Sequence, residues 1–161
     1  MTFYGGVDPG LSGAIFLFDP NGATVVLDMP VVARGVSFAD IATWLSPMQL
    51  HTEMIYVENV HAMPRQGVSS MFKFGTSFGG VLGVLATLKV PYTMVEPSVW
   101  KRAVGLPAGA PKELSVKRAI QVFPKFADRF TRPKQRGTGI IPLDGRAEAA
   151  LIAWHCYQKC Q

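Results

Sequence analysis

The chain has 161 residues, of which 48% are hydrophobic, and a formal net charge of +5 at pH 7. This length predicts one domain spanning residues 1–161, with a single hydrophobic core. No stretch reaches the roughly 18 apolar residues of a membrane span, and the N-terminus lacks the basic and apolar segments of a signal peptide. We therefore expect a cytoplasmic protein with no membrane partner.

The positive charge is concentrated in the C-terminal part of the chain. Residues 101–161 contain twelve Lys and Arg against four acidic residues, whereas residues 1–100 contain four against seven. Several of the basic residues gather in the Pro- and Gly-bearing segment 129–136. Because phosphate contacts by Lys and Arg attract nucleic acids, this distribution favours a polyanionic partner over a basic surface that serves only solubility.

The first part of the chain predicts an antiparallel meander. Short apolar or alternating runs, separated by Pro- and Gly-bearing turns, predict strands over residues 3–7, 14–18 and 23–29. A helix with Ser37 as its N-cap follows and extends to about Leu45. A fourth strand, 54–57, then places Glu58 at its C-terminal end.

The second part of the chain alternates helices and strands. Residues 69–89 predict a helix in which Gly75, Gly79 and Gly83 recur every fourth residue, and such a face permits close packing against a sheet or a second copy of the chain. The remaining elements are a strand over 92–95, a short helix from 98, a helix over 112–123, an irregular segment over 124–142 and a final helix over about 145–159. This order predicts an α/β fold with a mixed sheet.

Four acidic residues form the candidate site. Asp8 and Glu58 each follow a valine at the end of an apolar strand, so neighbouring central strands would bring both to one sheet edge. Asp144 and Glu148 share one side of the last helix, and its docking at that edge would close a four-carboxylate pocket. Converging carboxylates indicate a cation between them, with a divalent metal as the simplest candidate. Taken alone, Asp8 also fits an ordinary turn and Asp144 an ordinary N-cap.

Several short motifs occur in a fixed order along nearly the whole chain. They are Val7-Asp8-Pro9-Gly10 with Ser12-Gly13, Val57-Glu58, the Gly-rich segment 74–79, the segment 95–101 and Asp144-Gly145-Arg146-Ala147-Glu148-Ala149. Together they resemble the RuvC family of Holliday-junction resolvases, especially its compact phage and bacterial relatives. The resemblance implies a ribonuclease H-like fold with a mixed five-stranded sheet flanked by helices. It also implies a homodimer that cuts four-way or branched DNA by paired symmetric nicks, using Mg²⁺ or Mn²⁺, as a nucleoid-associated protein.

By position, Asp8, Glu58, Asp144 and Glu148 match the family's four metal-binding catalytic acids. Two cations held by such ligands help water to attack a phosphodiester and stabilise the departing oxygen. The chain departs from the best-known members, in which the last two acids are both Asp and three residues apart. We expect conserved chemistry with an altered metal geometry or preference.

The DNA-binding residues are predicted from charge and from the same resemblance. Phe72 would stack on an exposed base at the junction centre, or alternatively pack in the core. The basic candidates would contact backbone phosphates, which position a substrate without reading its sequence. They are Arg65, Lys73, Lys101, Arg102, Lys112, Lys117, Arg132, Lys134 and Arg136.

Two other functions fit parts of the sequence. Gly75-Thr76-Ser77-Phe78-Gly79 matches the nucleophile elbow of a serine hydrolase, and Asp144 and His155 follow Ser77 in the usual order. That elbow requires a strand before Ser77, where the glycine spacing favours a helix. The second alternative is a branched-DNA-binding module without catalysis. Four retained acids argue against it, because a negative pocket would repel phosphate.

Overall fold

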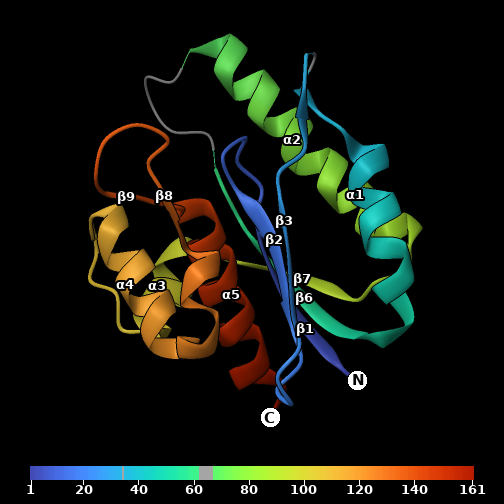
Figure 1. Cartoon of the computed structure of the whole chain (residues 1–161). Helices are drawn as coiled ribbons and strands as arrows, with labels where there is room; N and C mark the ends of the chain where they lie inside the picture. Colours follow the sequence, from blue (N-terminus) through green and yellow to red (C-terminus); the bar gives the residue numbers. More distant parts are fainter. Residues whose placement is uncertain (34, 62–66) are drawn as a thin grey trace.

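The computed structural model describes residues 1–33, 35–61 and 67–161. Its centre is a five-stranded sheet in the order β3-β2-β1-β6-β7, with helices on both faces (Figure 1). β1 pairs antiparallel with β2 and parallel with β6, so the predicted mixed sheet and its opening meander are confirmed. The strands are β1 (Phe3–Asp8), β2 (Ala14–Phe18), β3 (Thr24–Asp28), β6 (Thr52–Glu58) and β7 (Tyr92–Val95).

Each face of the sheet is covered by its own set of helices. One face carries α1 (Phe38–Leu45) and α2 (Val68–Thr87), and the other carries α3 (Pro97–Ala103), α4 (Lys112–Val122) and α5 (Asp144–Cys160) (Figure 1). The predicted N-cap of α1 is confirmed, because the Ser37 hydroxyl accepts a hydrogen bond from the Asp40 N–H at 3.3 Å.

α5 lies directly against the middle of the sheet because β1 presents a glycine to it. A Cβ atom at Gly6 would lie 2.1 Å from the Ala149 carbonyl oxygen and 2.3 Å from the Ala153 nitrogen. Small residues on α5 complete this contact, and Ala149, Ala150 and Ala153 are fully buried. The close approach determines how near the N-terminus of α5 comes to the end of β1.

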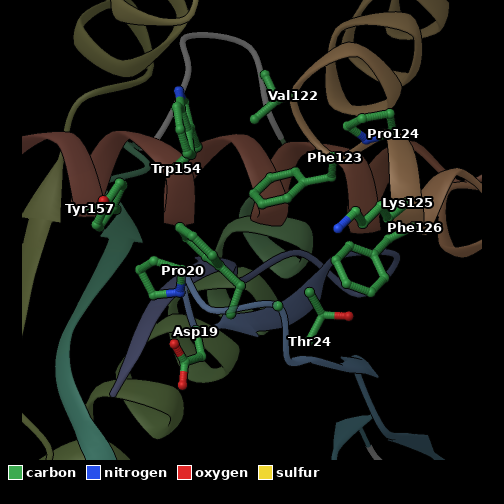
Figure 2. A pocket seen from close by; sticks show the side chains of 12 residues that line it. Asp19, Pro20, Thr24, Val122, Phe123, Pro124, Lys125, Phe126, Trp154 and Tyr157 are labelled. Atoms are coloured by element: carbon green, nitrogen blue, oxygen red, sulfur yellow. The ribbon is translucent and has the colours of Figure 1, made fainter. Parts of the chain in front are cut away.

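An aromatic pocket lies at the end of the sheet opposite Asp8. The register of β1 and β2 pairs Tyr4 with Phe18 at one end and Asp8 with Ala14 at the other. Beside Phe18, a pocket of about 340 Å³ is lined by aromatic rings from α5, from the end of α4 and from the segment after it, including Phe123, Phe126, Trp154 and Tyr157 (Figure 2). The pocket and the acidic residues are therefore separate features of the molecule.

Three segments differ from the sequence expectations. Residues 124–142 are not irregular: they form a 3₁₀ helix, η2 (Pro124–Arg129), and a hairpin of β8 (Thr131–Pro133) and β9 (Ile140–Pro142). A second hairpin, β4 (Val31–Val32) with β5 (Gly35–Val36), follows β3, and a 3₁₀ helix, η1 (Ser46–His51), follows α1. These elements are too short to leave a periodic sequence pattern.

The glycine face of α2 does not pack against the sheet. Cβ atoms at Gly75, Gly79 and Gly83 would each have nothing within 4 Å, while Ser77, Val81 and Leu85 are the buried residues of the helix. The sheet alternative for this face is therefore wrong. By length and composition α2 is long and apolar enough to cross a membrane, which the sequence did not predict. A single helix of this kind is weak evidence for a membrane span, because apolar helices of soluble proteins meet the same criterion.

Candidate active site

The structure brings the four predicted acids together at one edge of the sheet. β1 and β6 are parallel neighbours, with Val7 paired to Val57, so Asp8 and Glu58 follow at adjacent strand ends. The first turn of α5 lies against the loop after β1, since a Cβ at Gly145 would be 2.1 Å from the Ser12 carbonyl oxygen. This contact places Asp144 and Glu148 next to Asp8.

Asp8 is the most central of the four acids. Its Oδ1 accepts a hydrogen bond from the Gly10 N–H at 3.0 Å, which fixes the carboxylate in the turn. Burial, with a smaller contribution from the charges of Glu148 and Asp144, raises the pKa of Asp8 to about 6 despite the opposing effect of that hydrogen bond. Ionising Asp8 in the protein alone is therefore unfavourable, and a cation would relieve the cost.

Glu58 is buried, with 7% of its surface exposed. The indole N–H of Trp100 donates a hydrogen bond to its Oε1 at 2.9 Å. Burial, together with the charges of Asp8 and Glu148, raises the pKa of Glu58 to about 7, although the hydrogen bond from Trp100 opposes the rise. A buried carboxylate with one donor and two acidic neighbours lacks charge compensation.

α4 and α3 supply partners to the two acids of α5. The ammonium group of Lys112 forms an ion pair with the Asp144 carboxylate. The Ser115 hydroxyl donates to Glu148 Oε1 at 3.2 Å, and the Lys101 Nζ lies 4.0 Å from the same oxygen. Two lysines therefore provide positive charge beside the cluster.

The chemistry of the donor set fits a hard divalent cation. Four carboxylates from β1, β6 and α5 offer only oxygen ligands, which Mg²⁺ and Mn²⁺ prefer. Within the described residues, however, no three Asp, Glu, His or Cys side chains stand ready to hold an ion. The expected closed four-carboxylate pocket is thus an acidic cluster with Lys112 and Lys101 beside it.

Two further contacts hold the elements that carry these acids. Arg146 on α5 binds Asp28 at the end of β3 through two hydrogen bonds of 2.5 and 2.6 Å. The hydroxyl of Ser77 on α2 donates to the Pro9 carbonyl at 3.0 Å, next to Asp8. Sequence analysis assigned none of these contacts, because each joins residues far apart in the chain.

The DNA-binding candidates fall into three groups. Lys101 and Lys112 lie beside the acids, and Phe72 is 77% exposed, so the core-packing alternative for it is wrong. Phe72 and Lys73 line a groove of about 530 Å³ against the β4–β5 hairpin. The others are exposed: Arg102 on α3, Lys117 on α4, and Arg132, Lys134 and Arg136 on the β8–β9 hairpin or its turn; Arg65 lies outside the described residues.

The serine hydrolase interpretation is wrong. Ser77 lies in the middle of α2, is 3% exposed and uses its hydroxyl to hold Pro9. His155 is also buried and packs edge-on against the ring of Tyr56, with ring centroids 5.6 Å apart. Ser77 is therefore neither on a strand-to-helix turn nor accessible to a substrate.

Comparison with known proteins shows similarity in structure alone. No protein-family model matches the chain, and no curated protein does. A structure of Thermus thermophilus RuvC aligns with a TM-score of 0.61 at 16% identity, covering 99% of this chain and 96% of that one. T. thermophilus RuvC in complex with a Holliday junction substrate aligns with a TM-score of 0.57 at 15% identity and the same coverage. The chain therefore has a RuvC-like, ribonuclease H-like fold, as the sequence predicted.

Proposed function

We propose that this chain is a metal-dependent, structure-selective endonuclease that resolves four-way DNA junctions by paired nicks. The observation that carries the proposal is the convergence of Asp8, Glu58, Asp144 and Glu148 at one sheet edge, with lysines beside them. A site for phosphate alone would not concentrate carboxylates, because they repel the phosphate charge. The RuvC-like fold supports the junction as substrate, since one of its structural neighbours is bound to a Holliday junction.

In the proposed mechanism, the four acids hold Mg²⁺ or Mn²⁺. When bound, the cations supply Lewis-acid stabilisation of the charge that develops at the phosphodiester. Asp8 is the central ligand, because its carboxylate is close to Glu58 on one side and to the α5 acids on the other. Lys112 neutralises Asp144 in the free protein, and its ammonium group would be available to a substrate phosphate at this site.

The exposed basic and aromatic residues would hold the DNA around this site. Phe72 is available for stacking on an unpaired base, and Lys73 beside it for the adjoining phosphate. The phosphate backbone of the DNA arms would contact exposed Lys and Arg side chains on three elements. These contacts position the junction without reading its sequence. They are Arg102, Lys117, Arg132, Lys134 and Arg136, together with Arg65, which lies outside the described residues.

The proposed enzyme acts as a homodimer through the glycine face of α2. This face lies opposite the buried side of the helix, and its glycines have open space above them. It is also flanked by exposed apolar side chains, with Val68 84% and Met71 36% exposed. Two copies joined here would carry two sites, as paired symmetric nicks require.

The dimer is tested by Gly79→Leu, which adds a bulky side chain to open space and leaves the monomer's packing unchanged. We expect sedimentation velocity to show the wild type as a dimer and the variant as a monomer. Gln121→Leu, on the exposed side of α4, is the matched control and should remain dimeric. A wild type that stays monomeric at micromolar concentration, with or without junction DNA, would rule out the dimer.

The activity is tested with a labelled synthetic four-way junction beside linear duplex of the same sequence, in Mg²⁺, Mn²⁺ or EDTA. Symmetric nicks on the junction alone, absent in EDTA and in Asp8→Asn, are the expected result. Asp128→Asn removes an exposed carboxylate on η2 and serves as the charge-matched control. Tight junction binding without cutting in any metal would instead indicate a branched-DNA-binding module. The absence of both binding and cutting would refute the proposal.

A further inference from the structure

Trp100 is the fully buried residue that contacts the acidic cluster through a polar atom. None of its surface is exposed, yet its indole N–H reaches Glu58 Oε1 at 2.9 Å. An indole has one donor and no acceptor, so this bond uses its whole hydrogen-bonding capacity. Apolar packing alone would be satisfied by a Phe or Leu, and the N–H is the feature that such a residue would lack.

The helix that carries Trp100 is tied to the strand that carries Glu58. Asn59, the residue after Glu58, donates from its side-chain amide to Glu96 Oε1 at 2.6 Å, and its backbone N–H bonds the Val95 carbonyl at 2.8 Å. Glu96 directly precedes α3. The indole is therefore held at a fixed position relative to the end of β6.

The next residue of α3 reaches a different acid. Lys101 Nζ lies 5.2 Å from the centroid of the Trp100 ring and 4.0 Å from Glu148 Oε1. Two consecutive side chains of one short helix thus engage carboxylates of β6 and of α5. The bond from the indole therefore holds the Glu58 carboxylate at its Oε1 atom.

We propose that Trp100 is a positioning residue for divalent cation binding: its indole N–H holds the Glu58 carboxylate through Oε1. This inference rests on the proposed function, in which Glu58 is a metal ligand. A carboxylate held at one oxygen loses less conformational freedom on binding a cation than one that rotates freely. Without the N–H, Glu58 would bind cations more weakly and would lose its preference for one geometry.

Trp100→Phe tests this, because it keeps a large ring and removes the donor. We expect calorimetric titration of Mn²⁺ in the absence of DNA to show an affinity about tenfold weaker than that of the wild type, within the 10- to 100-fold typical of lost ligand-orienting bonds. Phe130→Leu, a change at another fully buried aromatic of the same core, is the control for lost packing and should leave Mn²⁺ affinity unchanged. In a Glu58→Gln background, Trp100→Phe should add no further loss.

A second measurement titrates the wild type, so it does not depend on the folding of Trp100→Phe. The indole N–H resonance of Trp100, assigned with Trp44→Phe and Trp154→Phe, should shift on titration with Mg²⁺, while that of Trp44, on the opposite face of the sheet, should not. An unmoved Trp100 resonance, or unchanged Mn²⁺ affinity in Trp100→Phe, would overturn the inference without contradicting the proposed nuclease function. Absence of Mn²⁺ binding by the wild type would overturn the metal-dependent function and this inference together.

Discussion

Replacing Asp8 by Asn is expected to stabilise the metal-free protein above pH 7 while it abolishes cleavage. Burial and the nearby acids raise the pKa of Asp8 from its ordinary value of 3.8 to about 6. When the pKa of a carboxyl group is raised in the folded state, its contribution to stability is complete below the pKa of the unfolded state. This contribution is lost as the pH rises through the pKa of the folded state. Asn cannot ionise, and its amide oxygen can still accept the bond from Gly10.

The size of the effect follows from the same pKa. Since a tenfold change in proton affinity is worth about 1.4 kcal/mol, the wild type should lose up to about 3 kcal/mol between pH 4 and pH 8 through Asp8. The pKa of Glu58, raised to about 7, extends the loss toward pH 8. Mg²⁺ at 100 times its Kd should offset most of this loss, because a ligand at that concentration stabilises the wild type by about 2.7 kcal/mol.

The measurement is urea unfolding followed by circular dichroism, at pH 5 and pH 8, in EDTA and in Mg²⁺. The free energy of unfolding of Asp8→Asn should exceed that of the wild type by about 1–3 kcal/mol at pH 8 in EDTA, and by less at pH 5. Asp128→Asn, at an exposed position, controls for net charge, and its unfolding free energy should equal that of the wild type at both pH values. If the unfolding free energies of Asp8→Asn and the wild type differ by the same amount at pH 5 and pH 8, burial and repulsion do not raise the pKa of Asp8.

Three other substitutions separate the roles of neighbouring features. Phe72→Ala should weaken junction binding in gel shifts by about 1–3 kcal/mol with little change in unfolding free energy, because Phe72 is 77% exposed; equal affinity would exclude stacking. Gly6→Ala should cost more than about 3 kcal/mol of unfolding free energy by overpacking against the α5 backbone. Arg146→Lys should lower cleavage several-fold in the junction assay while changing thermal stability by about 1 kcal/mol or less, since Asp28 is 60% exposed; wild-type cleavage would show that the two-bond contact is not needed.

The sheet was predictable because its signals are local. Each of the first three strands is a short apolar run that ends in a turn-forming sequence, and Val7 and Val57 mark the strand ends that carry Asp8 and Glu58. The β8–β9 hairpin gave no such signal, since each strand has three residues and includes a proline. The bond from the Leu143 N–H to the Phe130 carbonyl, at 2.9 Å, only extends this hairpin by one pair, and strands this short show no clear hydrophobic alternation.

The candidate acids were also predictable, but their partners were not. A charged residue after an apolar strand is unusual enough to stand out in a single sequence, as Glu58 does. The donors to these acids are ordinary residues: Trp100 fits any apolar core, and Ser115 fits any helix. They contact Glu58 and Glu148 only because α3 and α4 dock beside α5 in one arrangement, and periodicity does not determine how helices dock.

The docking of α5 links the stability of this fold to its proposed chemistry. Gathering four carboxylates is unfavourable, and the raised pKa values of Asp8 and Glu58 reflect that cost. The cost is offset by the burial of most α5 residues between Ala147 and Cys156 against β1 and β2. Because this packing begins one turn after Asp144, the α5 acids cannot withdraw from Asp8 without breaking the core contact at Gly6. The cluster therefore relaxes by recruiting Lys112, Lys101 or a metal cation, and competition among these cations should control when the site is ready to cut.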